Sequence, residues 1–216
     1  MFDGLFDTQT VPEARVHTYG AVTLRVLSVS RENQHIDKFV PLVVWHAAEE
    51  ACAALAGDYA HLVQGKTVIE LGAGTGLAGL VAAVVSGADC LLTDGDASSV
   101  DAASESVRLN GLQARVRTAQ LQWGDVAAAR AVVMGRRFQV ALATDVIYDR
   151  DAIAPLLTTA SAVLEPGGRF VFFNHKFRFA RLESEVRHAL DSVPGLALAE
   201  TMKLGDVDVF IIDRCA

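Results

Sequence analysis

Cysteine is scarce in this chain. Its 216 residues include only Cys52, Cys90 and Cys215, which lie far apart and form no CxxC pair. This number and spacing argue against a disulfide framework or a zinc cluster and are typical of a reducing compartment. Residues 1–10 (MFDGLFDTQT) contain no basic side chain, so they do not have the pattern of a signal peptide. The sequence therefore predicts a cytoplasmic protein and leaves the nucleus open as a second location.

Long apolar runs and an excess of positive charge are missing as well. No apolar run reaches the roughly 18 residues that a membrane-spanning helix needs, so no membrane partner is expected. Lys and Arg number 19 against 26 Asp and Glu, which gives a formal net charge of −7. A protein that binds DNA or RNA regardless of sequence carries the opposite sign, so we expect no nucleic-acid partner. The acidic balance suits small molecules or basic proteins as partners.

Hydrophobic residues, by contrast, are plentiful. They make up 51% of the chain and charged residues 21%, which is typical of an ordered globular protein. The length favours a single domain that needs no disulfide or metal to hold its core together. We found no internal repeat, coiled-coil pattern or large apolar stripe, and a monomer is the default expectation.

Short apolar runs alternate with helical stripes after residue 65, and this alternation indicates an α/β fold. The expected strands are 67–71, 90–93, 115–122, 138–143, 169–173, 196–202 and 207–213. The expected helices are 77–85, 98–109, a helix capped by Asp151, and one from Phe179 to Leu190. Strands joined through helices form a parallel sheet with right-handed crossovers. The last two strands are separated only by a short turn containing Gly205, so they form a hairpin that adds an antiparallel strand at or near one edge.

The sequence before the sheet predicts two further elements. Residues 15–30 form a small accessory β-hairpin around Gly20, and residues 44–55 form a helix that covers the sheet. We therefore divide the single domain into an N-terminal segment, 1–38, and a ligand-binding part, 39–216. The predicted fold is a Rossmann-like, mostly parallel seven-stranded sheet with helices on both faces and an antiparallel closing strand.

The most informative motif is ELGAGTG at residues 70–76, at the end of a strand and the start of a helix. Open α/β sheets bind ligands at this place. A dinucleotide fingerprint starting at Gly72 needs another glycine where Leu77 stands, and a phosphate loop needs a lysine where Leu80 stands. What remains is a pattern in which the acidic Glu70 precedes a row of glycines. A carboxylate beside the loop is a poor neighbour for a phosphate but a good one for a cation. S-adenosylmethionine carries an ammonium and a sulfonium and no phosphate, so it fits this loop.

Asp94 supplies a second acidic group at the end of the next strand. It follows Gly72 by 22 positions, close to the spacing of about 20 at which ribose-binding acids occur in the analogous dinucleotide fold. A carboxylate there can accept hydrogen bonds from both ribose hydroxyls. Structural alternatives stay open: the glycines could form only a tight turn, Glu70 could cap backbone amides, and Asp94 could cap a helix in competition with Asp96.

Residues 70–77 (ELGAGTGL) resemble the class I, seven-strand S-adenosylmethionine-dependent methyltransferases. Three further stretches, 44–48 (VWHAA), 121–125 (LQWGD) and 145–148 (DVIY), are similar to motifs of the non-SET protein-lysine methyltransferases, methyltransferase family 16. Members of that group modify lysines on chaperones and elongation factors, and histidine and arginine modifiers also exist. The loop at 174–178 (NHKFR) is only loosely similar to the family's basic segment there.

The resemblance implies roles for individual side chains. S-adenosylmethionine is the implied cofactor, with S-adenosylhomocysteine as product. Trp123 is expected near its adenine and Trp45 near its methionine end. The remaining cofactor-binding residues implied here are Glu70, Gly72, Ala73, Gly74, Asp94 and Thr144. Both tryptophans could instead be ordinary packing residues.

Transfer of a methyl group to an amine needs alignment and a lone pair on the nitrogen. A lysine has an ordinary pKa of about 10.4, so it arrives mostly protonated. Asp145 is expected to orient the amine by accepting its hydrogen bond, and Tyr148 to form a wall of the acceptor channel. Asp145 could alternatively cap a helix and Tyr148 could pack in the core. His175 could act as a general base or be a loop residue, and Phe177 and Phe179 could line the channel.

The sequence leaves three functions open. The first is a protein-lysine N-methyltransferase acting on a protein substrate. The second is a methyltransferase for a small molecule or for another side chain such as histidine, since no motif selects a protein target. The third is a scaffold that keeps the fold without catalysis, against which the intact acidic and glycine residues argue. No metal is expected, because the histidines other than His175 show no metal-ligand spacing.

Overall fold

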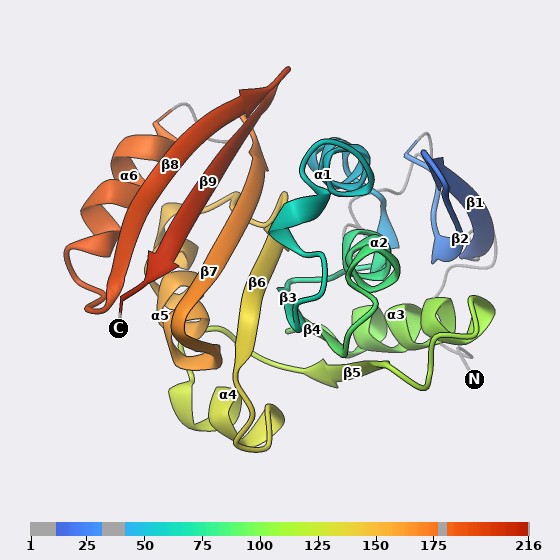
Figure 1. Ribbon diagram of the computed structural model, residues 1–216, viewed down its shortest axis with the longest axis horizontal. Helices are drawn as coiled ribbons and strands as arrows, with labels where there is room; N and C mark the ends of the chain where they lie inside the picture. Colours follow the sequence, from blue (N-terminus) through green and yellow to red (C-terminus); the bar gives the residue numbers. More distant parts are fainter. Residues whose placement is uncertain (1–11, 32–41, 177–180, 216) are drawn as a thin grey trace.

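A seven-stranded sheet forms the centre of the part of the chain that the computed structural model describes, residues 12–31, 42–176 and 181–215. The strand order is β5-β4-β3-β6-β7-β9-β8 (Figure 1). The first five of these strands are parallel, and β9 pairs antiparallel with both β7 and β8. The bounds are β3 Val68–Leu71, β4 Cys90–Asp94, β5 Val116–Gln120, β6 Phe138–Thr144, β7 Leu164–His175, β8 Leu196–Leu204 and β9 Val207–Arg214. The predicted Rossmann-like sheet is confirmed, with β8 at one edge.

The central strands are hydrophobic on both faces because helices cover both. All four residues of β3 are buried; Val68 faces one core cluster, and Ile69 and Leu71 face the other. Nearly continuous apolar strands, interrupted in β3 by Glu70, are typical of a parallel sheet enclosed between two helical layers. The strand ends at the glycine loop, which therefore starts from a rigid, fully buried base.

Six α-helices form the two outer layers in the described ranges (Figure 1). Helices α1, α2 and α3 contribute to one core cluster, and α4, α5 and α6 to the other. Their bounds are α1 His46–Ala56, α2 Leu77–Ser86, α3 Ala97–Leu109, α4 Val126–Val132, α5 Ile153–Val163 and α6 Leu182–Leu190, with short 3-10 helices at Ala60–Leu62 and Arg150–Ala152. None of these helices is long and apolar enough to cross a membrane.

A separate β-hairpin, β1 (Glu13–Tyr19) and β2 (Val22–Ser28), packs beside α2 and α3. Strand β2 alternates: Val22, Leu24 and Val26 are buried in the core, and the residues between them are exposed. The main chain of β2 is bound to α3, because the Leu27 N–H donates to Ser106 Oγ at 3.0 Å. The predicted accessory hairpin is therefore present. The division at residue 38 stays a prediction, since it lies outside the described residues.

The structure corrects the predicted elements in a few places. Asp151 does not cap α5: Asp149 accepts a hydrogen bond from the Asp151 N–H and caps the 3-10 helix that precedes α5. The seven-residue helix α4 was not predicted, because its alanine-rich sequence is too short to show a helical stripe. Strand β7 begins earlier than expected, at Leu164. The predictions for Phe177 and Phe179 lie outside the described residues.

Candidate active site

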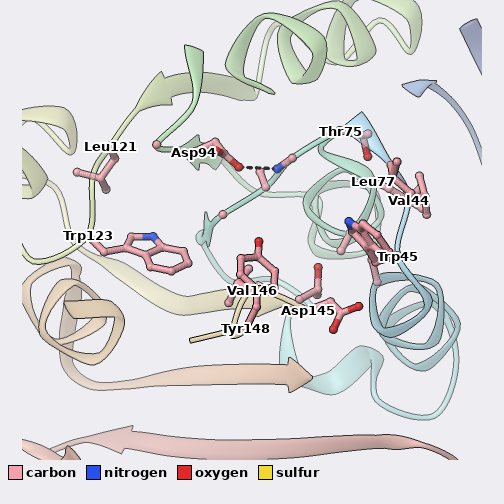
Figure 2. A pocket seen from close by; sticks show the side chains of 18 of the residues that line it. Val44, Trp45, Thr75, Leu77, Asp94, Leu121, Trp123, Asp145, Val146 and Tyr148 are labelled. Atoms are coloured by element: carbon pink, nitrogen blue, oxygen red, sulfur yellow. Dashed lines mark hydrogen bonds between the residues drawn. The ribbon is translucent and has the colours of Figure 1, made fainter. Parts of the chain in front are cut away.

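A cavity of about 300 Å³ opens where β3, β4 and β6 end. It lies at the carboxyl ends of these parallel strands, where open α/β sheets bind their ligands. Its lining comes from the loops after these strands and after β5, from the segment before α1 and the first turn of that helix, and from α2 and α5 (Figure 2). Of the ten residues expected to bind the cofactor or to orient and enclose the acceptor amine, nine line the cavity: Trp45, Gly72, Ala73, Gly74, Asp94, Trp123, Thr144, Asp145 and Tyr148.

Gly72 begins the loop after β3 in a backbone conformation that favours glycine. Its φ is +80°, in the left-handed region. A Cβ atom at this position would lie 2.7 Å from Val146 Cγ1 and 2.9 Å from the Trp123 ring. Any side chain on residue 72 would therefore push against the cavity wall. The loop can pass close to a ligand only with glycine here.

Asp94 is tied to the glycine loop rather than to a helix end. Its Oδ2 accepts the Gly74 N–H at 2.8 Å (Figure 2), and its Oδ1 accepts the Asp96 N–H at 2.9 Å. Helix α3 is capped by Asp96, which accepts from the Ser98 and Ser99 N–H groups. Burial raises the pKa of Asp94, and its hydrogen bonds from backbone N–H groups oppose that rise. The open alternative of Asp94 as a helix cap is thus wrong, and its carboxylate is held at the cavity wall.

Glu70 is the one predicted cofactor-binding residue that the cavity lining does not include. Its side chain is buried, with Oε2 accepting the Gly79 N–H of α2 at 2.9 Å. Its Oε1 has no hydrogen-bond partner in the described part of the chain. Burial raises the pKa of Glu70 to about 8. In this arrangement Glu70 joins β3 to α2 from behind the glycine loop, as the backbone-capping alternative expects.

The end of the cavity at Trp123 is built by a loop that sequence analysis only partly identified. Trp123 is half-buried, and the Gly124 N–H after it donates to Thr159 Oγ1 at 2.9 Å. The Thr159 hydroxyl in turn donates to the carbonyl of Pro155, also at 2.9 Å. Thr159 is buried on α5, 35 residues away in sequence. Its position gave no signal, because a threonine on an apolar helical face has many ordinary explanations.

Asp145 and Trp45 lie at the other end of the cavity, across from Trp123 (Figure 2). Asp145 is buried, and its φ of +55° is rare for a residue with a side chain. Strained backbone of this kind is found most often at functional sites. The Asp145 Oδ1 accepts the His175 N–H at 3.3 Å. Tyr148 also lines the cavity but is 58% exposed, so it is not a core residue and stands at the mouth.

The strand order and this site define the fold of a class I, S-adenosylmethionine-dependent methyltransferase. Solved structures agree with it. The Thermus thermophilus 16S rRNA N2 G1207 methyltransferase, in complex with AdoMet and guanosine, superimposes with a TM-score of 0.67 at 18% identity, over 98% of this chain and 52% of that one. The ribosomal protein L11 methylase of Lactobacillus delbrueckii gives a TM-score of 0.56 at 16% identity, over 85% of this chain and 80% of that one. At these identities the likeness concerns the fold.

Sequence comparison narrows the class to a family. The family model described as lysine methyltransferase matches residues 27–189, and the chain belongs to this family. Similar curated proteins include protein N-lysine methyltransferase METTL21A of Danio rerio, 33% identical over 67% of this chain and 64% of that protein. The protein-lysine N-methyltransferase EFM3 of Chaetomium thermophilum is 33% identical over 48% of this chain and 33% of that protein. The chain thus spans less than two thirds of the length of these relatives.

Proposed function

We propose that this protein is an N-methyltransferase that transfers a methyl group from S-adenosylmethionine to a lysine side chain of a protein substrate. The observation that carries the proposal is that one cavity joins the Asp94–glycine loop contact at one side to the strained Asp145 and exposed Tyr148 at the other. Membership of the lysine methyltransferase family supports the same activity. Both named relatives are lysine methyltransferases that act on proteins.

The chemistry of the cavity fits this cofactor. The edge of the Trp123 ring packs directly on Gly72, which has no side chain to displace it, and Trp123 lines the cavity, so a flat ring system can lie against the indole there. The Asp94 carboxylate can accept hydrogen bonds from two vicinal hydroxyls in addition to the Gly74 N–H. Trp45 lies at the Asp145 end, where its ring can face a cation. S-adenosylmethionine, when bound, supplies a methyl group on a positively charged sulfur.

The residues at the Asp145 end suit an amine acceptor. Asp145 is buried, so its carboxylate can form a strong hydrogen bond with an incoming amine and fix its direction. A carboxylate also favours the charged amine, and its role is therefore to bind and orient rather than to remove the proton. Tyr148 provides an aromatic wall that excludes water from one side of the acceptor.

The proposed partner is a protein that presents an exposed lysine, and the proposed location is the cytoplasm. The net charge of −7 supports a basic or lysine-rich partner surface. We also propose that the protein acts as a monomer and that residues 39–216 form its cofactor-binding part. The cavity supports that division, because all of its lining residues lie between Val43 and Pro155.

A pair of matched variants tests the proposed function. Asp145→Asn keeps the size of the side chain and removes its charge, while Asp101→Asn removes a charge from the exposed face of α3. We expect calorimetric binding of S-adenosylhomocysteine to stay within about threefold of wild type for both. Transfer of radiolabelled methyl groups to proteins of a cell lysate should fall at least tenfold only for Asp145→Asn. Equal transfer by the two variants would contradict the role of Asp145, and absence of any labelled protein with wild type would contradict the function.

A further inference from the structure

Asn174 is a buried polar side chain that the proposed chemistry does not use. It lies near the end of β7, is 0% exposed, and is not part of the cavity lining. Its Oδ1 accepts the Ile147 N–H at 3.1 Å, and its Nδ2 donates to the Ile147 carbonyl at 3.4 Å. One side chain thus binds both main-chain groups of a single residue 27 positions away in sequence. Ile147 stands between Asp145 and Tyr148.

The segment that Asn174 holds follows β6 and is neither helix nor strand from Asp145 to Tyr148. Asp145 adopts a φ of +55° there, and such a conformation persists only when surrounding contacts determine it. Strand β7 provides these contacts: the Asp145 N–H donates to the Phe173 carbonyl at 2.8 Å, and the His175 N–H donates to Asp145 Oδ1 at 3.3 Å. Residues 173–175 therefore bind the segment at both its start and its centre.

We propose that Asn174 is a positioning residue that sets the backbone of residues 145–148 and thereby the directions of the Asp145 carboxylate and the Tyr148 ring. Its two hydrogen bonds replace the sheet or helix partners that Ile147 would otherwise need, and buried main-chain groups without partners are costly. The assignment of these side chains to the acceptor amine rests on the proposed function. The positioning itself rests on the hydrogen bonds alone.

Two variants separate positioning from simple loss of stability. Asn174→Ala removes both contacts with Ile147. Asn174→Asp keeps an acceptor for the Ile147 N–H but loses the donor to its carbonyl. The control is Ser106→Ala, which removes another buried side chain that accepts a backbone N–H, that of Leu27 in the hairpin, and that is not part of the cavity lining. All three are compared with wild type by thermal unfolding, amide hydrogen exchange at Ile147, S-adenosylhomocysteine affinity and methyl transfer.

A positioning role of Asn174 predicts a specific pattern of effects in the three variants. Exchange of the Ile147 amide should accelerate at least tenfold in Asn174→Ala, and kcat should fall with it. Asn174→Asp places a carboxylate against the Ile147 carbonyl in a buried position, so both effects should appear there as well. The Kd for S-adenosylhomocysteine should stay within about threefold of wild type. Ser106→Ala should lower the unfolding temperature with kcat and Ile147 exchange unchanged.

The proposal is overturned if Ile147 exchange is unchanged in Asn174→Ala, or if Ser106→Ala changes exchange and kcat equally. It is also overturned if Asn174→Asp keeps full kcat while cofactor affinity collapses. Should Asn174→Ala fail to fold, the slower turnover of Asn174→Asp with retained cofactor affinity decides the question. If wild type labels no protein, the proposed function fails, while the exchange measurement still decides the positioning.

Discussion

Gly72→Ala puts the geometry of the glycine loop to a quantitative test. The added methyl group would start 2.7 Å from Val146 Cγ1 and 2.9 Å from the Trp123 ring, both too close for unchanged packing. The left-handed backbone at φ +80° costs an L-residue about 1–2 kcal/mol. Overpacking against the cavity wall adds about 1–3 kcal/mol. We expect the free energy of unfolding to fall by the sum of these two costs, about 2–5 kcal/mol.

Gly87→Ala is the matched control for this variant. Gly87 follows α2 with φ +69°, and a Cβ atom there would meet nothing within 4 Å. The free energy of unfolding of Gly87→Ala should fall only by the cost of the left-handed backbone, about 1–2 kcal/mol. By calorimetry, Gly72→Ala should bind S-adenosylmethionine at least tenfold more weakly, about 1.4 kcal/mol, because the Trp123 wall is displaced. Gly87→Ala should bind as wild type does. Equal affinity of both variants would refute the placement of the ligand against the wall that Gly72 and Trp123 form.

Substitutions at three further positions test the supports of the cavity. Burial raises the pKa of Glu70 from its ordinary 4.5 to about 8, so wild-type stability should fall as pH rises between these values. Glu70→Gln keeps an acceptor for the Gly79 N–H and does not ionise. Denaturant unfolding at pH 5 and pH 8.5 should therefore show a much smaller loss of stability for this variant than for wild type. A loss as large as that of wild type would contradict the reasoning. Thr159→Val removes the acceptor of the Gly124 N–H and should weaken cofactor binding severalfold, whereas Thr159→Ser should restore it; equal affinities would show that the hydroxyl does not position the loop. Asp94→Asn should reduce calorimetric affinity by about 1.5–3 kcal/mol, the usual worth of a charged hydrogen bond, and an unchanged affinity would place the ribose elsewhere.

Much of the fold could be predicted from local patterns. Strands such as Val68–Leu71 are short, apolar except for Glu70 and followed by glycine, so their type and approximate position follow from composition and from the glycine at their end. The site could be located for a related reason, because the carboxyl ends of parallel strands meet at one edge. The acidic and glycine residues at 70–76, Asp94 and Asp145 therefore had to lie near one another once the strands were assigned.

The parts that escaped prediction depend on contacts between distant residues. Thr159 and Asn174 act through partners 35 and 27 positions away, and a sequence pattern contains no information on such pairs. The sequence left the role of Glu70 open between two alternatives, and its hydrogen bond with the Gly79 N–H of α2 agrees with the backbone-capping one. The cap at Asp149 was missed because Asp149 and Asp151 are chemically equivalent candidates, and only the start of the 3-10 helix at Arg150 decides between them.

The most direct test of the central claim is the identity of the methylated residue. The protein would be incubated with S-adenosylmethionine carrying a radiolabelled methyl group and a cell lysate, and the labelled proteins would then be hydrolysed to amino acids. Our account predicts that the label elutes with methylated lysine standards, and that Asp145→Asn removes it. Label in methylhistidine, or confined to small molecules, would contradict the assignment of a protein lysine as the acceptor.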